Sequence, residues 1–480
     1  MRRQRLTGLQ GVIGMFVLVI VLLFALALGA NRPVSWSFLS LFVLFAFALQ
    51  VAVIFANPLP LALREAFLPG VLFVSAVLWG WVQSTPGVLT GLAHPVWDLV
   101  PEVAPAISAD PGQGRHAVMR LLCYACIFVM MVWTCTSSTR AGLVLKIIAL
   151  FSSALAAYGL YAFLTGSNVI LDDWAQRGVV QASFVNRNSY ATYAAFGVLA
   201  NIAAYLFVTE NSNTGLRSRL EAFFGGGWIF GLGVLLCLGA LSLTQSRAGG
   251  GAALAGLAVF LVAWRGGKTR WDPVMLGLIG AVLIFIGATS ATGLMERLLA
   301  TDASGGRFVV YPGMIEGILD RPFLGHGLGA FHEAFRPYIP LEGAVGEWVR
   351  AHSTYLEVAF GLGIPAALVF FLGQGLLIWR IWRGSVERRS NRVFACFALG
   401  CVATAAFHSV FDFSLQMPAT AGLFSVILAL GFAQSFGREA MDRKMRTDTP
   451  SARLSFESEN AGSRSREKLP QGPAGSESDD

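Results

Sequence analysis

Long apolar segments recur along most of this chain, separated by short polar stretches. A helix needs about 20 apolar residues to cross the hydrocarbon core of a bilayer. Twelve segments reach or approach that length and predict membrane-spanning helices. They lie at 11–29, 34–56, 66–83, 117–136, 141–164, 188–208, 227–245, 248–264, 273–290, 354–382, 393–411 and 419–436. The pattern predicts an all-α membrane protein with about 12 transmembrane helices, in one multi-span domain over residues 1–436.

Basic residues gather in the short loops on one side of this arrangement. With the amino terminus inside, the cytoplasmic loops contain Arg217, Arg219, Arg265, Lys268, Arg270, Arg383, Arg388, Arg389 and Arg392. Because positively charged short loops stay in the cytoplasm, both termini are expected on that side. Residues 437–480 are rich in Ser, Glu, Arg and Gly. They are expected to form a disordered cytoplasmic tail, since such a composition cannot bury a core.

The composition agrees with an integral membrane protein. The 480 residues are 55% hydrophobic and 13% charged, with a mean hydropathy of +0.62, whereas soluble domains carry about 25% charged residues. The net charge of +7 is accounted for by the loops, so no nucleic-acid partner is expected. The six cysteines lie in or beside apolar stretches, and we expect packing residues instead of disulfides or a metal site. The first apolar run lacks a small-residue cleavage site and is expected to remain as an anchor.

Three longer loops then face outward, at 84–116, 165–187 and 291–353. The last is the longest and is expected to be periplasmic. Residues 308–319 carry apolar side chains at helical spacing and predict a helix in the outer interface. A glycine turn at 325–329 and a short segment at 330–335 follow. A loop of this kind suits a cover over a site that opens toward lipid.

Two arginines are candidates for binding an anion. Arg247 lies in the brief turn between two spans, where an unpaired cation is costly. It is either a side chain that extends to lipid headgroups or a bidentate clamp on a substrate phosphate. The small residues at 249–251 favour tight packing, and hence burial. Arg307 opens the interfacial helix, where free N–H groups and the helix dipole suit an anion; the alternative is a solvated charge.

His352 precedes the predicted span at 354–382. Thr354 and Glu357 match a capping box, which would start the helix there. The positive helix end favours the neutral imidazole that a general base needs; the alternative is a surface histidine at the membrane boundary. His408 and Asp412 share one helical face. They either pair structurally or place a second polar group in the cavity.

Further polar groups lie near the predicted site. Asn186, Arg187 and Asn188, at the start of the span at 188–208, suit a sugar or a diphosphate. They equally suit a helix start capped by Asn188. The glycine turn at 325–329 resembles a phosphate-binding loop but lacks the lysine of a P-loop. No metal-ligand motif is present, so neither a metal nor another cofactor is expected.

Taken in order, several of these segments resemble the O-antigen ligase and O-antigen polymerase superfamily of bacterial inner-membrane proteins. The segments are FVNRNSYATY at 184–193, SRAG at 246–249, GR at 306–307, DRPFLGHGLGAF at 320–331, AHSTYL at 351–356 and HSVFD at 408–412. They extend over roughly 184–436, about half of the chain.

The resemblance implies a C-type glycosyltransferase fold and a specific reaction. Members transfer glycan from an undecaprenyl-diphosphate carrier to an acceptor hydroxyl on a glycan or on lipid A core, without a metal. By this resemblance Arg247 and Arg307 grip the diphosphate and His352 activates the acceptor. Asn186, Arg187, Asn188, Arg321, His326, His408 and Asp412 are candidate supporting residues. One departure is Gly361, where the family often has a glutamate; Glu357 is a candidate replacement.

Two other functions stay open at this stage. A transporter of a small anion would place polar residues at mid-span near broken helices, whereas here they gather at the outer ends of spans. A non-catalytic scaffold for envelope assembly would leave the outer arginines without a role. The sequence does not separate a ligase from a polymerase, since the two differ in the acceptor.

Overall fold

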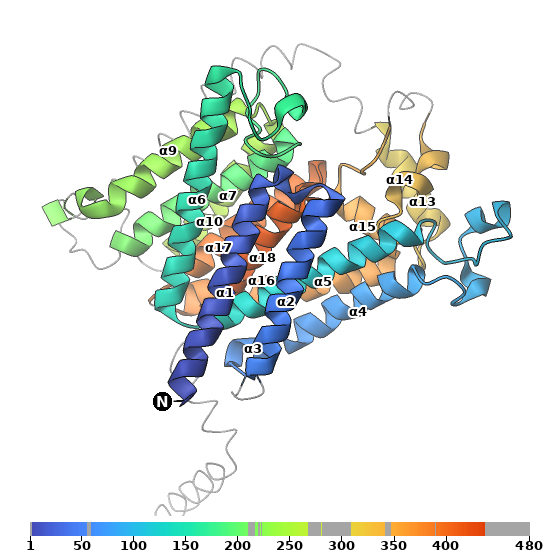
Figure 1. The fold of residues 1–480 in the computed structure, drawn as a ribbon, viewed down its shortest axis with the longest axis horizontal. Coiled ribbons are helices and arrows are strands. Elements are labelled where there is room, and N and C mark those ends of the chain that lie inside the picture. The colour runs from blue at the N-terminus through green and yellow to red at the C-terminus, as the bar shows by residue number, and fades with distance from the viewer. Residues whose placement is uncertain are drawn as a thin grey trace, which may run out of the picture. The chain divides into compact units, whose positions relative to one another are not determined.

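The computed structural model describes residues 2–54, 59–209, 217–218, 221, 223–266, 280, 309–340, 347–388 and 390–436. Within these ranges the chain is helical and contains no strand (Figure 1). The helices up to Ser435 form one compact unit. The all-α prediction is therefore confirmed for the part of the chain that the structure covers.

The longer helices alternate with short turns along the whole described chain. Their bounds are α1 Arg2–Leu26, α2 Pro33–Ile54, α3 Leu61–Glu65, α4 Phe67–Gln83, α5 Pro111–Thr134, α6 Ser138–Thr165, α7 Arg187–Thr209, α9 Trp228–Leu243, α10 Arg247–Arg265, α13 Tyr311–Asp320, α14 Phe331–Ala334, α15 Thr354–Leu362, α16 Ile364–Glu387, α17 Val393–Phe411 and α18 Pro418–Ala433. A π-helical turn at Phe223–Gly227 precedes α9.

Nine helical segments in the described ranges are long and apolar enough to cross a membrane, and α4 and α18 are shorter apolar helices. Together they match every predicted span except 273–290, which lies outside the described residues apart from position 280. The chain is thus a polytopic membrane protein, and the number twelve stays a prediction. The predicted tail at 437–480 also lies outside the described residues.

Small residues allow close helix packing in the interior. Nearly every residue of α7 and α18 is buried. A methyl group at Gly256 would collide with Thr404 and the backbone of Gly400, both on α17. One at Gly249 would collide with Ala191 of α7. Because lipid tails are as apolar as the helices, no hydrophobic force drives the helices together in a bilayer. The close approach of the backbones instead stabilises the bundle through van der Waals contacts. The tight packing predicted from residues 249–251 is confirmed.

The span predicted at 354–382 is not continuous, and this prediction was wrong. The helix breaks at Gly363, which has a φ of +79° and separates α15 from α16. A methyl group at this position would collide with the carbonyl of Phe323. The amide of Ile364 donates to the carbonyl oxygen of Pro322 over 2.7 Å. The break therefore lets the loop after α13 dock between the two helices.

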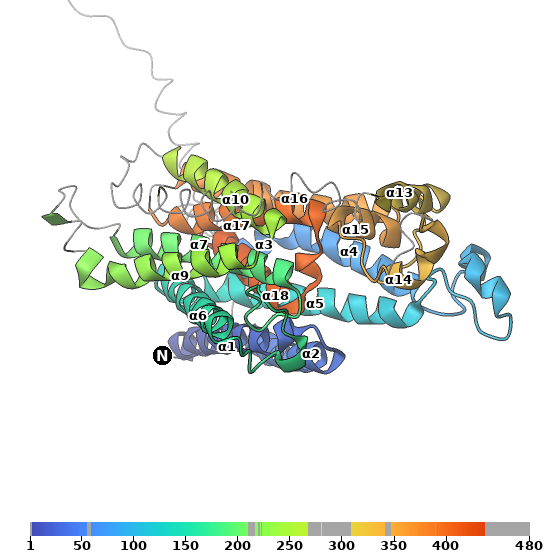
Figure 2. The ribbon, with the colours of Figure 1, turned by 90° about the horizontal axis from the view of Figure 1, so that it is seen from above.

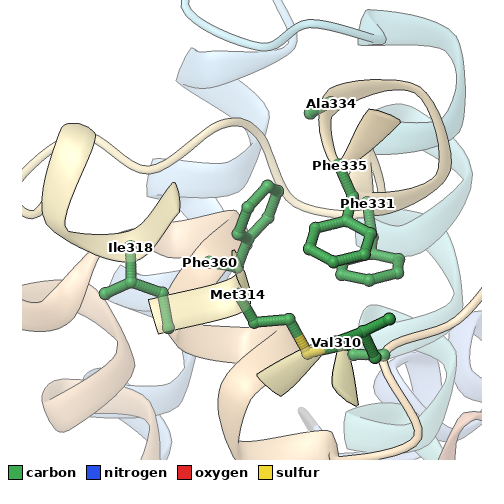
Figure 3. Close-up of a cluster of buried hydrophobic side chains, with 8 residues drawn as sticks. Val310, Met314, Ile318, Phe331, Ala334, Phe335 and Phe360 are labelled. Atoms are coloured by element: carbon green, nitrogen blue, oxygen red, sulfur yellow. The ribbon is translucent and has the colours of Figure 1, made fainter. Parts of the chain in front are cut away.

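The short helices α13, α14 and α15 gather at one end of the unit, beside the loop that joins α4 to α5 (Figures 1 and 2). Figure 3 shows the hydrophobic cluster that holds them together. Its buried members are Val310, Met314, Ile318, Phe331, Ala334, Phe335, Ala351 and Phe360. Helix α13 and the short segment α14 confirm the predictions for 308–319 and 330–335 as far as the structure covers them.

Arginines bind the carboxyl ends of helices near the turns between α5 and α6 and between α16 and α17. Arg140 donates to the carbonyl oxygen of Thr134, and Arg392 donates to that of Ala263. Arg380 and Arg388 donate to Ser435 and Gln434. Cations complement the negative ends of helix dipoles. Two of the basic residues that were expected in cytoplasmic loops, Arg388 and Arg392, are thus fixed at helix ends.

Candidate functional site

His352 lies directly before α15, as predicted, in a strained backbone conformation. Its φ is +51°, in the left-handed region that costs energy for a residue with a Cβ. The hydroxyl of Tyr311 donates to its carbonyl oxygen over 3.2 Å. The imidazole, partly exposed, lies between two aromatic rings, with centroids 5.9 Å from Trp348 and 5.0 Å from Phe413. Such strain persists only where the surroundings impose it, and it is typical of functional sites.

Polar side chains from α7, α17 and the turn after α17 meet next to this histidine. We call them the α7–α17 polar cluster: Asn188, Thr192, His408, Asp412 and Ser414. The Asn188 amide donates to the Asp412 carboxylate over 2.7 Å, and the amide of Phe413 donates to the same carboxylate over 2.8 Å. Asp412 is fully buried, so these donors offset the cost of removing its charge from water.

The second half of the cluster is organised around a hydroxyl group. Ser414 Oγ lies 2.9 Å from His408 Nδ1, and Thr192 donates to the same oxygen over 3.0 Å. His408 is fully buried. On the other side, Thr354 Oγ1 donates to the carbonyl oxygen of Asp412 over 3.3 Å. That bond joins the segment carrying His352 to the cluster, so His408 and Asp412 lie close to the predicted base.

Neither helix cap considered in the sequence is present: another residue caps α7, and α15 has no side-chain cap. Asn186, not Asn188, caps α7, since its Oδ1 accepts from the amides of Asn188 and Ser189. Arg187 is the first residue of α7 and is partly exposed. The capping box at 354–357 does not form, because Ser353 is the residue before α15 and makes no side-chain cap. The capping role left open for Asn188 is thus excluded, and the capping box predicted for Thr354 was wrong; both side chains donate to Asp412.

Arg247 is the first residue of α10, at the helix end that contacts the start of α7. The Ser246 hydroxyl caps this helix by accepting from the amide of Gly249 over 3.1 Å. Gly249 in turn packs on Ala191, one turn along α7 from Asn188. The Arg247 side chain is exposed, so the expected burial was wrong, although its place at this helix end fits a phosphate contact. Arg307, the second predicted clamp, lies outside the described residues.

Glu357 holds the residues that precede His352. Its carboxylate accepts from the amide of Ala351 over 2.9 Å and from Nη1 of Arg350 over 3.1 Å. The Glu357 side chain is only 9% exposed. Arg120 of α5 also interacts electrostatically with this pair. Glu357 therefore fixes the backbone next to His352. At Gly361 the space is tight, since a methyl group there would lie 3.1 Å from the carbonyl oxygen of Gly327.

Arg321 and His326 belong to a separate network. Arg321 donates to the carbonyl oxygens of Gly325, Ala93 and Leu92. His326 Nδ1 lies 2.9 Å from His94 Nε2, and its Nε2 lies 2.8 Å from the carbonyl oxygen of Gly317. The His326 ring stacks on Phe360 with centroids 4.2 Å apart. Through these bonds, both residues join the loop between α4 and α5 to the loop after α13. None of the bonds involves His352.

The tautomers of the two histidines in this network follow from their bonds. The amide of Val96 donates to His94 Nδ1 over 3.2 Å, so the proton of a neutral His94 is on Nε2. It points to His326 Nδ1, which leaves the proton of His326 on Nε2, facing the Gly317 carbonyl. Burial lowers the pKa of His94 to about 3, and the charges of His326 and Arg321 act in the same direction. Burial and Arg321 also lower the pKa of His326. The pair is therefore neutral at physiological pH.

The glycine turn at 325–329 serves packing. Gly325, Gly327 and Gly329 all have positive φ values, and added methyl groups would collide with the backbone of Gly361, with Ser108 and with the backbone of Gln113. The amide of Gly327 donates to the carbonyl oxygen of Gly361 over 2.9 Å. Neighbouring segments of the same chain thus occupy the space that a phosphate would need.

Several contributors were not predicted. Trp348 and Phe413 flank the imidazole, and Tyr311 holds its carbonyl group; Thr192 and Ser414 complete the polar cluster. The sequence offered one weak signal, since Phe413 and Ser414 directly follow Asp412. No group of three or more His, Cys, Asp or Glu side chains in the described ranges could hold a metal ion.

Comparison with known protein families gives one match. Residues 232–371 match a family model described as O-Antigen ligase. The matched region includes Arg247, Arg321, His326 and His352, whereas Asn188, His408 and Asp412 lie outside it. No curated protein matches the chain. The match confirms the resemblance found in the sequence: residues 232–371 of this chain are similar to the O-antigen ligase family.

Proposed function

We propose that the protein transfers a glycan from an undecaprenyl-diphosphate carrier to an acceptor hydroxyl at the periplasmic face of the bacterial inner membrane. The acceptor would be a growing glycan or lipid A core. The observation that carries the proposal is the position of His352, strained, partly exposed and joined through Thr354 to the buried α7–α17 polar cluster. A base and a set of fixed polar groups at the ends of membrane helices suit a substrate whose lipid stays in the bilayer.

In the proposed reaction His352 removes the proton from the acceptor hydroxyl. The acceptor oxygen then forms a bond with the anomeric carbon of the donor sugar, the bond from that carbon to the diphosphate oxygen breaks, and the configuration inverts. The electron pair leaves with the lipid diphosphate, and the proton stays on the imidazole. A positioned base contributes about 10²–10⁴-fold to such a rate.

Arg247 and Arg307 would neutralise the charge that grows on the leaving diphosphate. Guanidinium groups bind phosphate oxygens in pairs and stay charged, and electrostatic stabilisation of this kind is commonly the largest catalytic contribution. The exposed Arg247 at the start of α10 is available to a ligand that enters from the bilayer. The α7–α17 polar cluster would orient the sugar or the acceptor beside His352.

The transporter alternative gains one feature, because α15 and α16 form a broken helix at Gly363. In a transporter the break itself would line the binding site. Here the break is filled by the loop after α13, through the bond from Ile364 to Pro322, while the polar residues lie at the far end of α15. The geometry therefore favours transfer chemistry.

The test is a transfer assay with full-length protein in lipid nanodiscs, an undecaprenyl-diphosphate glycan and an acceptor. His352→Ala should lower the turnover rate by about 10²–10⁴-fold while donor binding is retained. His352→Gln, which keeps a hydrogen-bonding group but takes no proton at neutral pH, should be equally slow. His332→Ala is the matched control, because that histidine is paired with Glu347 away from the cluster. Near wild-type turnover in His352→Gln would overturn the role of base.

A further inference from the structure

A cavity of about 600 Å³ opens where α5 passes into α6. Its walls come from the start of α6, the end of α7 and the turn between α16 and α17. The lining residues are Ser138, Thr139, Arg140, Gly142, Leu143, Lys146, Phe207, Ser390 and Asn391. Asn188 and Phe207 both belong to α7 and are 19 positions apart, about 28 Å along the helix. The cavity is therefore at the opposite end of α7 from the candidate site.

Two cations line this cavity without an acidic partner. Arg140 uses its Nε to donate to the carbonyl oxygen of Thr134 over 2.8 Å. The Lys146 ammonium lies 5.7 Å from the ring centroid of Phe207. Among the residues that the structure covers, no carboxylate lies within ion-pair distance of either cation. A cation this close to the hydrocarbon region is costly unless an anion or water meets it.

The remaining walls are of two kinds. Ser138, Thr139 and Asn391 supply hydroxyl and amide groups, which can donate to anionic oxygens. Leu143, 48% exposed, and Phe207 supply apolar surface beside the cations. Gly142 keeps this wall close, since a methyl group there would collide with the Phe207 ring. A ligand that fits has an anionic group and an apolar part joined to it.

We propose that this cavity binds the phosphate headgroup of an anionic phospholipid from the inner leaflet. Basic pockets between transmembrane helices on the cytoplasmic side are suited to such headgroups. The assignment to the inner leaflet rests on the proposed topology, in which the basic loop that contains Ser390 and Asn391 is cytoplasmic. The apolar wall favours a lipid over free phosphate, because acyl chains would cover Leu143 while the headgroup meets Arg140 and Lys146.

The experiment measures lipid retention by native mass spectrometry and thermal stability in nanodiscs of defined composition. Phosphatidylglycerol should stay bound to the wild-type protein and raise its melting temperature relative to phosphatidylcholine alone. Each cation near a bilayer surface contributes about a fivefold change in affinity for anionic lipid. Lys146→Gln should therefore weaken binding about fivefold, and the double variant with Arg140→Gln should weaken it further.

Two matched variants make the result specific. Arg383→Gln removes one positive charge from the same side but from an exposed ion pair with Glu387, and should retain the lipid. Lys146→Arg keeps the charge and should also retain it, which separates lipid loss from misfolding. Equal retention in Lys146→Gln and wild type would overturn the site. Equal stabilisation by inorganic phosphate alone would overturn the lipid and leave a free-anion site. Glycan transfer is a separate readout, so its failure would not affect this test.

Discussion

The side-chain amide of Asn188 donates to the carboxylate of Asp412 over 2.7 Å, across a separation of 224 residues. The bond joins the first turn of α7 to the turn that follows α17. Because Asp412 is fully buried, its charge depends on this donor and on the amide of Phe413. The main-chain carbonyl oxygen of the same aspartate accepts from Thr354 at the start of α15, so three segments of the candidate site meet at one residue.

Replacing Asn188 should therefore destabilise the protein and disturb the site. Asn188→Ala removes a donor from a buried charge and should cost about 1–3 kcal/mol. Asn188→Asp should cost more, since it sets a second carboxylate beside Asp412. Thermal unfolding in nanodiscs measures both, with Asn186→Ala as a comparison that loses only a helix cap. An Asn188→Asp variant as stable as wild type would contradict the importance of this bond.

Glu357 should act on the rate as well as on stability. Glu357→Ala removes the acceptor for the Ala351 amide and for Arg350 and should cost about 1.5–3 kcal/mol. It should lower kcat while the KM for the donor changes little, because the carboxylate fixes the backbone next to His352 through Ala351 and Arg350. The matched control is Glu333→Gln, whose side chain is 44% exposed in its pair with Arg336. If both variants behave alike, Glu357 has no positioning role.

Gly325 should tolerate no side chain. Gly325→Ala combines a φ of +68° with a collision against the backbone of Gly361 and Gly363. Gly87→Ala is a control for the backbone conformation alone, because Gly87 has a φ of +76° and no atom near its absent Cβ. The control should cost about 1–2 kcal/mol, and Gly325→Ala about 1–3 kcal/mol more through overpacking. Denaturant or thermal unfolding measures both losses of stability. Equal losses in Gly325→Ala and Gly87→Ala would show that the turn at 325–329 adjusts to the added methyl group.

Low pH should weaken the contact between the loop at 84–110 and the loop after α13. The pKa of His94 falls from an ordinary value of 6.5 to about 3 in the folded protein. As the pH drops below 6.5, the unfolded chain binds a proton that the folded chain does not, so stability is lost between about pH 6.5 and 3. His94→Gln can keep both hydrogen bonds without titrating and should lose less stability over this interval. Thermal unfolding measures the stability of both proteins over this interval. If wild type and His94→Gln lose stability equally as the pH falls, His94 is excluded as the cause of the acid destabilisation.

The proposed topology can be tested at two exposed positions. Leu99, in the loop between α4 and α5, is 81% exposed, and Ser390, between α16 and α17, is also exposed. Leu99→Cys should react with a membrane-impermeant thiol reagent in cells with a permeabilised outer membrane, and Ser390→Cys only after the inner membrane is lysed. Five native cysteines are buried and one is half-buried, which limits background labelling. The reverse pattern would invert the proposed orientation.

Much of the helical architecture was predictable from hydropathy. The predicted span at 393–411 coincides with α17, and that at 66–83 differs from α4 by one residue. The break at Gly363 was not predictable in this way, because the residues on both sides are apolar and no polar residue marks the boundary. At the break, Pro365 has no amide to continue the helix, and the Ile364 amide donates instead to Pro322, far earlier in the chain. Hydropathy reports neither feature.

The candidate site was predicted in its components and not in its connections. The sequence indicated His352, His408, Asp412 and Asn188 as polar residues at helix ends. It left a sugar or diphosphate contact and a helix cap open for Asn188, because local spacing does not show that the buried carboxylate of Asp412, directly after α17, accepts from the same amide. Arg321 and His326 seemed equivalent to the others in the sequence, yet their partners are Gly325, the residues at 92–94 and Gly317, which define a second network.

The break at Gly363 should separate the position of His352 from changes in bilayer thickness. The 24 residues of α16 extend about 36 Å, so this helix adapts to a thinner membrane by tilting. If α15 continued α16, each change in tilt would move His352 with it. Because α15 is packed instead into the cluster with α13 and α14, we expect the tilt to be taken up at Gly363 and the distance from His352 to Asp412 to stay constant in membranes of different lipid composition.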